Sequence, residues 1–261
     1  MKNKLLLFSL LLAGSAFLFS CKKDTTTTDP SIETTKQISA FVSINSDGID
    51  SLVFTYDAAG VLTKMDEYTN HSSASLTHNF LTEFGYSGGK YVTRTKYSLS
   101  NNQKINYEKD SIGYDSNNLA VKLFGYNLDI NNNFVLNTNY TTVITYNSSN
   151  LPVKFDHGNG NYDTYENYTN GDVNTVKGYE NNALIETDTY QYDNKNNPFK
   201  GNVAYFGNLA FYVTNDVVKE TYGTDAINYT YTYNSANYPI KMVQVWGTTS
   251  ADTETDLIYY K

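Results

Sequence analysis

A short pattern that begins with tyrosine recurs seven times along this chain of 261 residues, and it restricts the fold more than any other feature. A basic side chain follows each tyrosine after eight residues, or after nine in one unit. The tyrosines are Tyr56, Tyr86, Tyr114, Tyr146, Tyr168, Tyr192 and Tyr233. The basic residues are Lys64, Arg94, Lys122, Lys154, Lys177, Lys200 and Lys241. Such a recurrence indicates one supersecondary unit copied along the chain.

The residues around these tyrosines are typical of a β-hairpin. Tyrosine and threonine alternate in residues 228–233, which places the tyrosines on one face of a strand. Most of the anchor tyrosines are followed by Asp or Asn, which can hydrogen-bond the backbone two residues on. Four residues past the tyrosine stands Gly60, Asn118, Asn150, Asn196 or Asn237. These residues tolerate φ > 0, so these five units predict a tight turn closed by a bulge. Lys90 stands at this position in the second unit, so that turn is predicted to be strained or different.

Seven hairpins, with an opening strand near residues 38–44 and a closing strand near 257–260, predict an all-β antiparallel meander over residues 37–261. We expect one curled open sheet or half-barrel, because open twisted sheets rarely stay flat beyond about ten strands. A β-propeller is the alternative, but its blades need about 40 residues each. Residues 201–227 interrupt the repeat, and their apolar stretch predicts a short helix or an extra strand that plugs one end of the sheet.

The N-terminus has the form of a secretory signal, with Lys2 and Lys4 before a short apolar run that ends at Phe19. Residues 18–21, Leu-Phe-Ser-Cys, resemble the lipobox of bacterial lipoproteins. That resemblance implies a signal peptide over residues 1–20, cleavage before Cys21 and acylation of its sulfur. Residues 21–36 then form a flexible lipidated tether, because they contain too few apolar side chains to bury. Residues 37–261 form the single repeat domain.

Two further resemblances bear on location and family. Residues 21–24, Cys-Lys-Lys-Asp, resemble surface-export signals of Bacteroidota lipoproteins, which implies a surface-exposed outer-membrane protein, with the periplasmic face as the alternative. Residues 56–64, Tyr-Asp-Ala-Ala-Gly-Val-Leu-Thr-Lys, resemble a unit of the YD (Rhs-type) repeats, and residues 192–200 are similar to units in Bacteroidota lipoproteins of unknown function. Large YD shells enclose toxins, but this chain has too few units for such a cavity, so that role is not carried over.

The net charge and the small number of cysteine and histidine residues disfavour several functional classes. The formal net charge of −8 becomes −10 once a leader with two lysines and no acids is removed, which disfavours nucleic acid as a partner. Cys21 is the only cysteine, and the spacing of His71, His78 and His157 matches no common metal signature. We therefore predict no catalytic residue, no metal and no cofactor. Acidic clusters at residues 156–166 and 252–256 leave separated carboxylates as an open question.

The favoured hypothesis is a non-catalytic cell-envelope lipoprotein that binds a glycan or a protein partner at the cell surface and contacts the membrane through its lipid. One alternative is a structural or assembly subunit of an envelope complex. A second alternative is a carboxylate-dependent hydrolase. The seven basic residues are a candidate anion- or glycan-binding stripe, although Lys and Arg also protect the outer face of a sheet from edge pairing.

Replacing Cys21 with alanine tests the anchor. The lipobox resemblance implies that the acyl chains are attached at Cys21, on its sulfur and on its new N-terminus. We therefore expect the Cys21→Ala protein to lose palmitate labelling and to leave the membrane fraction on centrifugation. A variant that stays firmly bound to membranes would contradict the lipid anchor.

Overall fold

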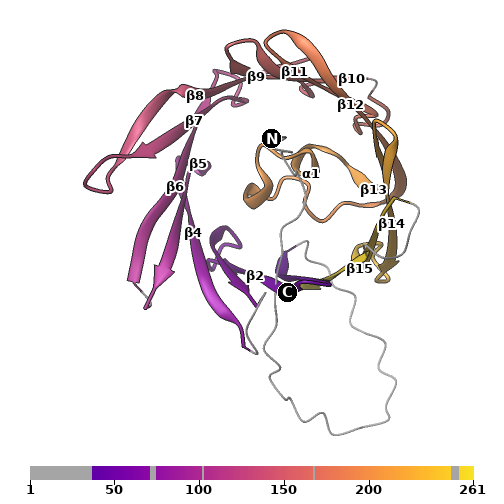
Figure 1. Ribbon diagram of the computed structural model, residues 1–261, viewed down its shortest axis with the longest axis horizontal. Coiled ribbons are helices and arrows are strands. Elements are labelled where there is room, and N and C mark those ends of the chain that lie inside the picture. The colour runs from indigo at the N-terminus through magenta and orange to yellow at the C-terminus, as the bar shows by residue number, and fades with distance from the viewer. Residues whose placement is uncertain (1–36, 71–74, 102, 167, 248–252) are drawn as a thin grey trace, which may run out of the picture.

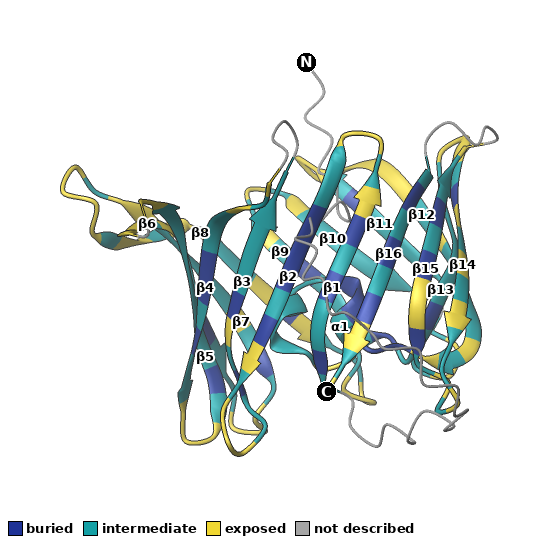
Figure 2. Ribbon diagram, turned by 90° about the horizontal axis from the view of Figure 1, so that it is seen from below, coloured by how far each residue is buried: buried dark blue, intermediate teal, exposed yellow. Residues whose placement is uncertain are grey.

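The computed structural model describes residues 37–70, 75–101, 103–166, 168–247 and 253–261. The signal peptide, Cys21 and the tether up to residue 36 lie outside the described residues, as does His71. Within the described part, sixteen antiparallel strands follow one another around a closed barrel, seen along its axis in Figure 1 and from the side in Figure 2. The meander order predicted from the repeat is therefore present, but its two ends meet.

The strands lie in chain order around the wall. They are β1 (Ile38–Asn45), β2 (Gly48–Tyr56), β3 (Leu62–Thr69), β4 (Thr77–Ser87), β5 (Lys90–Ser100), β6 (Gln103–Tyr114), β7 (Ala120–Leu128), β8 (Phe134–Tyr146), β9 (Pro152–Gly158), β10 (Asn161–Glu166), β11 (Thr175–Glu180), β12 (Ala183–Asn196), β13 (Asn215–Tyr222), β14 (Asp225–Tyr233), β15 (Pro239–Trp246) and β16 (Thr253–Tyr260). Odd-numbered strands all run in one direction, so β1, β3 and the others start at the same rim, which also carries Gln37.

The prediction of an open sheet or half-barrel, with a propeller as alternative, is wrong. β1 pairs antiparallel with β16, in a register that sets Phe41 opposite Ile258 and Ile44 opposite Thr255. An open meander of this length would leave two edge strands with unpaired N–H and C=O groups, and closure removes both edges. The repeat is a local sequence pattern, so it does not predict that the first and last strands pair with each other.

The side chains two residues before the anchor tyrosines point into the barrel. Phe54, Phe84, Ile112 and Ile144 are all less than 9 % exposed. Other inward rings touch the segment that enters the barrel: Phe41 lies 5.7 Å from Phe199, and Phe155 lies 5.7 Å from Tyr212 between ring centroids. Because successive strand residues alternate between faces, residues such as Thr55 and Lys64 point outward.

The interruption of the repeat is a plug inside the barrel. It joins β12 to β13 and carries the short helices η1 (Val203–Tyr205) and α1 (Leu209–Tyr212), which lie within the ring in Figure 1. The predicted bounds, 201–227, extend too far, because β13 and the start of β14 occupy the second half. Phe199 and Ala210 belong to the main core, so the plug supplies apolar surface that the wide barrel would otherwise lack.

A ring of tyrosine hydroxyls fastens neighbouring strands near the rim that carries the plug. Each hydroxyl donates to a backbone carbonyl within two residues of the start of the preceding odd-numbered strand. The pairs are Tyr56 to Ile38 (2.9 Å), Tyr86 to Leu62 (2.8 Å), Tyr114 to Tyr91 (2.6 Å), Tyr146 to Ala120 (2.7 Å), Tyr168 to Pro152, Tyr192 to Val173 (2.7 Å), Tyr231 to Val217 (2.7 Å) and Tyr260 to Pro239 (2.8 Å). These eight bonds, one for each strand pair, are called the tyrosine staples below.

The turns at this rim form as the sequence predicts in four places. At the first, the Asp57 carboxylate accepts the N–H groups of Ala59 and Val61, each at 2.9 Å, while Gly60 takes φ of 80°. Asn118, Asn150 and Asn237 take φ of 66°, 60° and 61° at the matching position. The prediction is wrong at Asn196, which pairs with Asn215 because the plug replaces that turn.

Removing one staple should cost stability without altering the fold. Tyr146→Phe keeps the ring but leaves the Ala120 carbonyl without its donor, so we expect a loss of about 1 kcal/mol in the free energy of unfolding. Tyr140→Phe is the matched control, because Tyr140 is 69 % exposed. Equal denaturant midpoints for Tyr146→Phe and the control would contradict the role of the staple.

Candidate functional site

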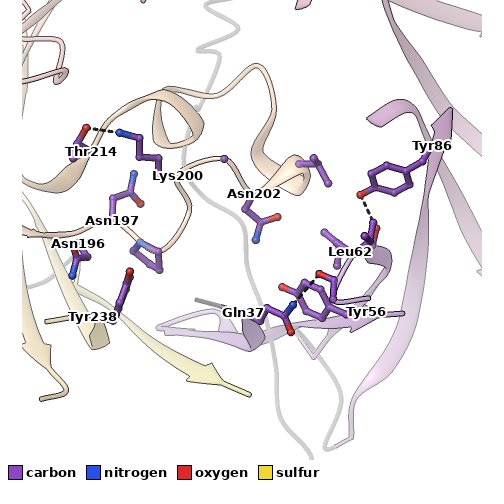
Figure 3. A pocket seen from close by; sticks show the side chains of 15 residues that line it. Gln37, Tyr56, Leu62, Tyr86, Asn196, Asn197, Lys200, Asn202, Thr214 and Tyr238 are labelled. Carbon is purple, nitrogen blue, oxygen red and sulfur yellow. Dashed lines mark hydrogen bonds between the residues drawn. The ribbon is translucent and has the colours of Figure 1, made fainter. Parts of the chain in front are cut away.

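A pocket of about 470 Å³ opens between the plug and the first strands of the barrel (Figure 3). It lies at the rim where β1 starts and the tyrosine staples are found. The lining residues are Gln37, Tyr56, Gly60, Val61, Leu62, Tyr86, Asn196, Asn197, Pro198, Lys200, Gly201, Asn202, Val203, Thr214 and Tyr238. In Figure 3 the plug provides one wall, and Gln37, Tyr56, Leu62 and Tyr86 provide the other.

The barrel wall of the pocket is held by a contact between Gln37 and the first tight turn. The Gln37 side-chain amide donates to the Gly60 carbonyl at 2.8 Å. Gly60 has φ of 80°, and a Cβ there would sit 2.5 Å from Gln37 Nε2. Glycine adopts this backbone conformation without strain, whereas asparagine fills the matching turns, and a side chain at residue 60 would displace the Gln37 amide.

Two buried polar side chains hold the plug in place. Asn197, 8 % exposed, donates its amide to the Ala210 and Val213 carbonyls at 2.7 and 3.0 Å. Asp172, 3 % exposed, accepts from the backbone N–H and the side-chain amide of Asn215 at 3.1 and 2.6 Å. The polar atoms of these two side chains are already hydrogen-bonded within the protein. Both residues therefore position the pocket wall and are not free to bind a ligand.

A carboxyl group below the plug stays protonated near neutral pH. Burial, reinforced by the nearby Asp193 carboxylate, raises the pKa of Asp216 to about 8. Tyr233, the last anchor tyrosine, donates to Asp193 here instead of to a backbone carbonyl. The hydroxyl of Tyr233 thus joins β14 to β12, and the protonated Asp216 adds no second negative charge beside Asp193.

The pocket combines phenol rings, amides and one lysine. Burial raises the pKa of Tyr56 and of Tyr86 to about 12, so both phenols stay neutral. Lys200 donates to Thr214 Oγ1 at 2.6 Å and keeps an exposed side chain, and the Tyr238 ring lies 5.9 Å from that of Tyr260. Among the described residues that line the pocket there is no carboxylate, histidine or cysteine. This lining can donate and accept hydrogen bonds and stack on a ring, but it holds no general acid or base for chemistry at neutral pH.

The seven anchor tyrosines do not gather at one site. Tyr56 and Tyr86 line the pocket, and the other five lie around the rim, where Tyr233 meets Asp193 and the rest donate in staples.

The seven basic residues separate as well. Arg94 points inward and binds Asp110 and Glu108, at 2.8 Å from Nε to Asp110 and 2.7 Å to Glu108. Lys200 lies on the plug. The remaining five, Lys64, Lys122, Lys154, Lys177 and Lys241, lie at strand positions whose side chains point outward. They are therefore not one continuous stripe.

The acidic clusters named from the sequence are also divided. Asp156 pairs with Lys154 at 2.6 Å, Glu166 with Lys177 at 2.6 Å, and Asp163 with His157 at 3.1 Å. His78 pairs with Asp66 at 2.9 Å on the outer face.

Glu254 and Asp256 line the inner wall, and Asp252 lies outside the described residues. Gln244 donates to Asp256 at 2.9 Å, Ser43 donates to Glu254 at 2.7 Å, and burial next to Glu254 raises the pKa of Asp256. Among the described residues, no three His, Cys, Asp or Glu side chains are arranged to hold a metal ion.

Sequence reasoning missed four residues at this rim. Gln37, Asn202 and Tyr238 carry no motif, and only the three-dimensional path of the plug brings them together. Tyr260 is an eighth anchor, and Pro239, six residues after Tyr233, is its acceptor. The alternation that includes Tyr260 is the signal that could have revealed it.

The described residues include no helix whose length and hydropathy would let it span a bilayer.

No protein-family model and no curated protein matches the sequence. Among solved structures, a porin-like protein from Bacteroides uniformis is similar at 13 % identity and a TM-score of 0.48, over 87 % of this chain and 98 % of that one. A porin-like protein from Bacteroides vulgatus gives 11 % identity and a TM-score of 0.43, over 86 % and 98 % of the two chains. The Tc holotoxin pore of Photorhabdus luminescens gives 10 % identity and a TM-score of 0.27, over 79 % of this chain and 13 % of that one. The barrel is therefore assigned from the strand pairing of this chain itself.

Proposed function

We propose that this protein is a non-catalytic, lipid-tethered binding protein of the cell envelope that holds a hydroxyl-rich glycan segment in the rim pocket. The observation that carries the proposal is the pocket lining, which joins aromatic rings to amides and hydroxyls and contains no carboxylate. Sugar rings present hydroxyl groups at their edges and C–H groups on their faces, so this mixture matches both parts of such a ligand.

The pocket is of suitable size and is built on rigid elements. Its volume of about 470 Å³ lies within the range of about 300–1,000 Å³ that small-molecule sites occupy. One wall is fastened by the Tyr56 and Tyr86 staples and the other by Asn197 and Asp172. A pre-formed site loses little conformational entropy on binding, which favours affinity for a weakly interacting neutral ligand.

The structure favours binding over hydrolysis at this site. Glycosidases place two carboxyl groups on opposite sides of the bond they cleave. Here Glu254 and Asp256 are 7 % and 0 % exposed, engage Ser43 and Gln244, and are absent from the pocket lining. The carboxylate-dependent hydrolase therefore receives no support from the pocket.

The outer face of the barrel supports a tether rather than insertion into lipid. Lys154 and Lys177 lie at outward strand positions and pair with Asp156 and Glu166. A lysine facing lipid at the middle of a bilayer costs about 2–4 kcal/mol, so such a face is suited to water. We therefore propose that the barrel stands in water and that Cys21 holds it at the outer membrane.

The proposed tether would also keep the pocket close to the membrane. Gln37 lines the pocket, and residues 21–36 precede it directly in the sequence. As a coil, a linker of this length spans roughly 20 Å, so the pocket rim would stay within about that distance of the membrane. This arrangement favours a glycan attached to the envelope over one free in the medium.

Tyr238 is the side chain with which to test the pocket, because its ring lies on the lining and no staple depends on it. We expect Tyr238→Ala to weaken binding about fivefold, since a ring contact of this kind contributes on the order of 1 kcal/mol. Glycan arrays identify the ligand, and calorimetry measures the affinity of the wild type and the variant.

Tyr259→Ala is the matched control, because Tyr259 is 50 % exposed on the neighbouring strand β16 and does not line the pocket. The proposal fails if no glycan binds the wild type at millimolar concentration, or if both variants bind the ligand equally well.

A further inference from the structure

The strands β6, β7 and β8 extend beyond the barrel wall and form a sideways projection, seen at the left of Figure 2. The tip comprises residues 103–108 of β6 and residues 126–142 of β7, its turn and β8. It is called the β6–β8 projection below. Because odd-numbered strands start at the pocket rim, the turn between β7 and β8 lies at the opposite rim, far from Gln37.

The β6–β8 projection concentrates exposed apolar side chains. They are Ile105 (44 % exposed), Tyr107 (54 %), Leu128 (37 %), Ile130 (97 %), Val135 (51 %), Leu136 (46 %) and Tyr140 (69 %). Val135 and Leu136 are adjacent in a strand, so the ribbon exposes both of its faces here. These side chains lie on both faces of the ribbon, so they form an apolar tip rather than one flat patch. Exposed apolar side chains gathered in this way indicate an interaction surface.

The β6–β8 projection also has an open backbone edge. On its β9 side, β8 pairs only from Val143 to Tyr146. Within the described residues, the nine residues from Phe134 to Thr142 have no strand partner on that side. Thr142 marks the boundary, where its hydroxyl lies 2.9 Å from His157 Nδ1. On its β7 side, β8 pairs at residues 134–136 and 141–143 with a register shift between them, so the open edge consists of two short segments. Either segment can form a β-ladder with another strand.

The charges near this edge do not oppose pairing with an identical edge. Residues 130–153 contain no charged side chain. Lys109 packs over the Tyr126 and Phe134 rings, at 4.9 and 5.8 Å from their centroids. Asp129 accepts the N–H of Asn133 in its own turn, and this contact lowers its pKa. A neutral edge can meet its own copy without like-charge repulsion, whereas natural edge strands commonly carry a charge that prevents this contact.

We propose that the β6–β8 projection pairs with the same projection of a second copy, with the open edges of the two β8 strands antiparallel about a two-fold axis. An antiparallel pair of identical strands is self-complementary, as a closed dimer requires. The β6–β8 projection extends sideways from the wall, so its edge is clear of the rest of the barrel (Figure 2). The proposal does not depend on the ligand of the pocket.

The test is the oligomeric state of the full chain in detergent, measured by sedimentation velocity over a range of concentrations. We expect a reversible dimer for the wild type and an increase of at least about tenfold in the dissociation constant for Leu136→Lys. Leu184→Lys is the matched control, since Leu184 is 54 % exposed in β12, outside the β6–β8 projection. It should dimerise like the wild type.

Single cysteines placed in turn at residues 135–141 locate the axis. The residue nearest the two-fold axis faces its own copy, so one position should give the most disulfide-linked dimer and its neighbours less. The wild type, whose only cysteine is Cys21, should give none.

Three outcomes would overturn the proposal. The first is a monomer at all concentrations, and the second is equal dimerisation of the Leu136→Lys and Leu184→Lys proteins. The third is a monomer that binds vesicles of phosphatidylethanolamine and phosphatidylglycerol and loses this binding in Leu136→Lys. That result would make lipid the occupant of the β6–β8 projection.

Discussion

The pairing of β1 with β16 is the interaction on which the rest of the structure depends. It turns a meander with two open edges into a barrel with an inside and an outside. Only then do Phe54, Phe84 and Ile112 share one core with Phe199 of the plug. The tyrosine staples act at the same rim, where each hydroxyl fastens an even-numbered strand to the odd-numbered strand before it. The sequence repeat thus helps the barrel to close. Each repeat gives a strand pair with a similar contact at the rim, and similar units arranged side by side form a regular ring.

Closure of the barrel also leaves an interior space, and the plug fills part of it. A wall of sixteen strands encloses more space than its own side chains fill. The segment between β12 and β13 occupies one end, held by Asn197 and Asp172. The proposed binding pocket lies where the plug and the wall meet without filling all of the space. Its lining of amides, phenols and Lys200 gives it recognition chemistry without an acid–base pair.

The local structure was predictable and the global structure was not. The turn at Asp57 and Gly60 could be inferred from the sequence because its hydrogen bonds lie within five residues. The pairing of Phe41 with Ile258 joins the two ends of the chain, and no local pattern encodes it. The same reason explains why Gln37 and Tyr238 were missed as neighbours in the pocket. Arg94 shared a repeat position with outward-facing lysines, but its inward partners Asp110 and Glu108 could be seen only in the structure.

Amide hydrogen exchange at the closing seam tests the central claim most directly. In a closed barrel, the paired amides of residues 40–44 in β1 and 255–259 in β16 should be protected as strongly as those of the interior pair β4 and β5. If β1 and β16 instead keep protection only toward β2 and β15, with the amides that face the seam exchanging at the rate of the exposed turns, the barrel is open and this account of the fold is wrong.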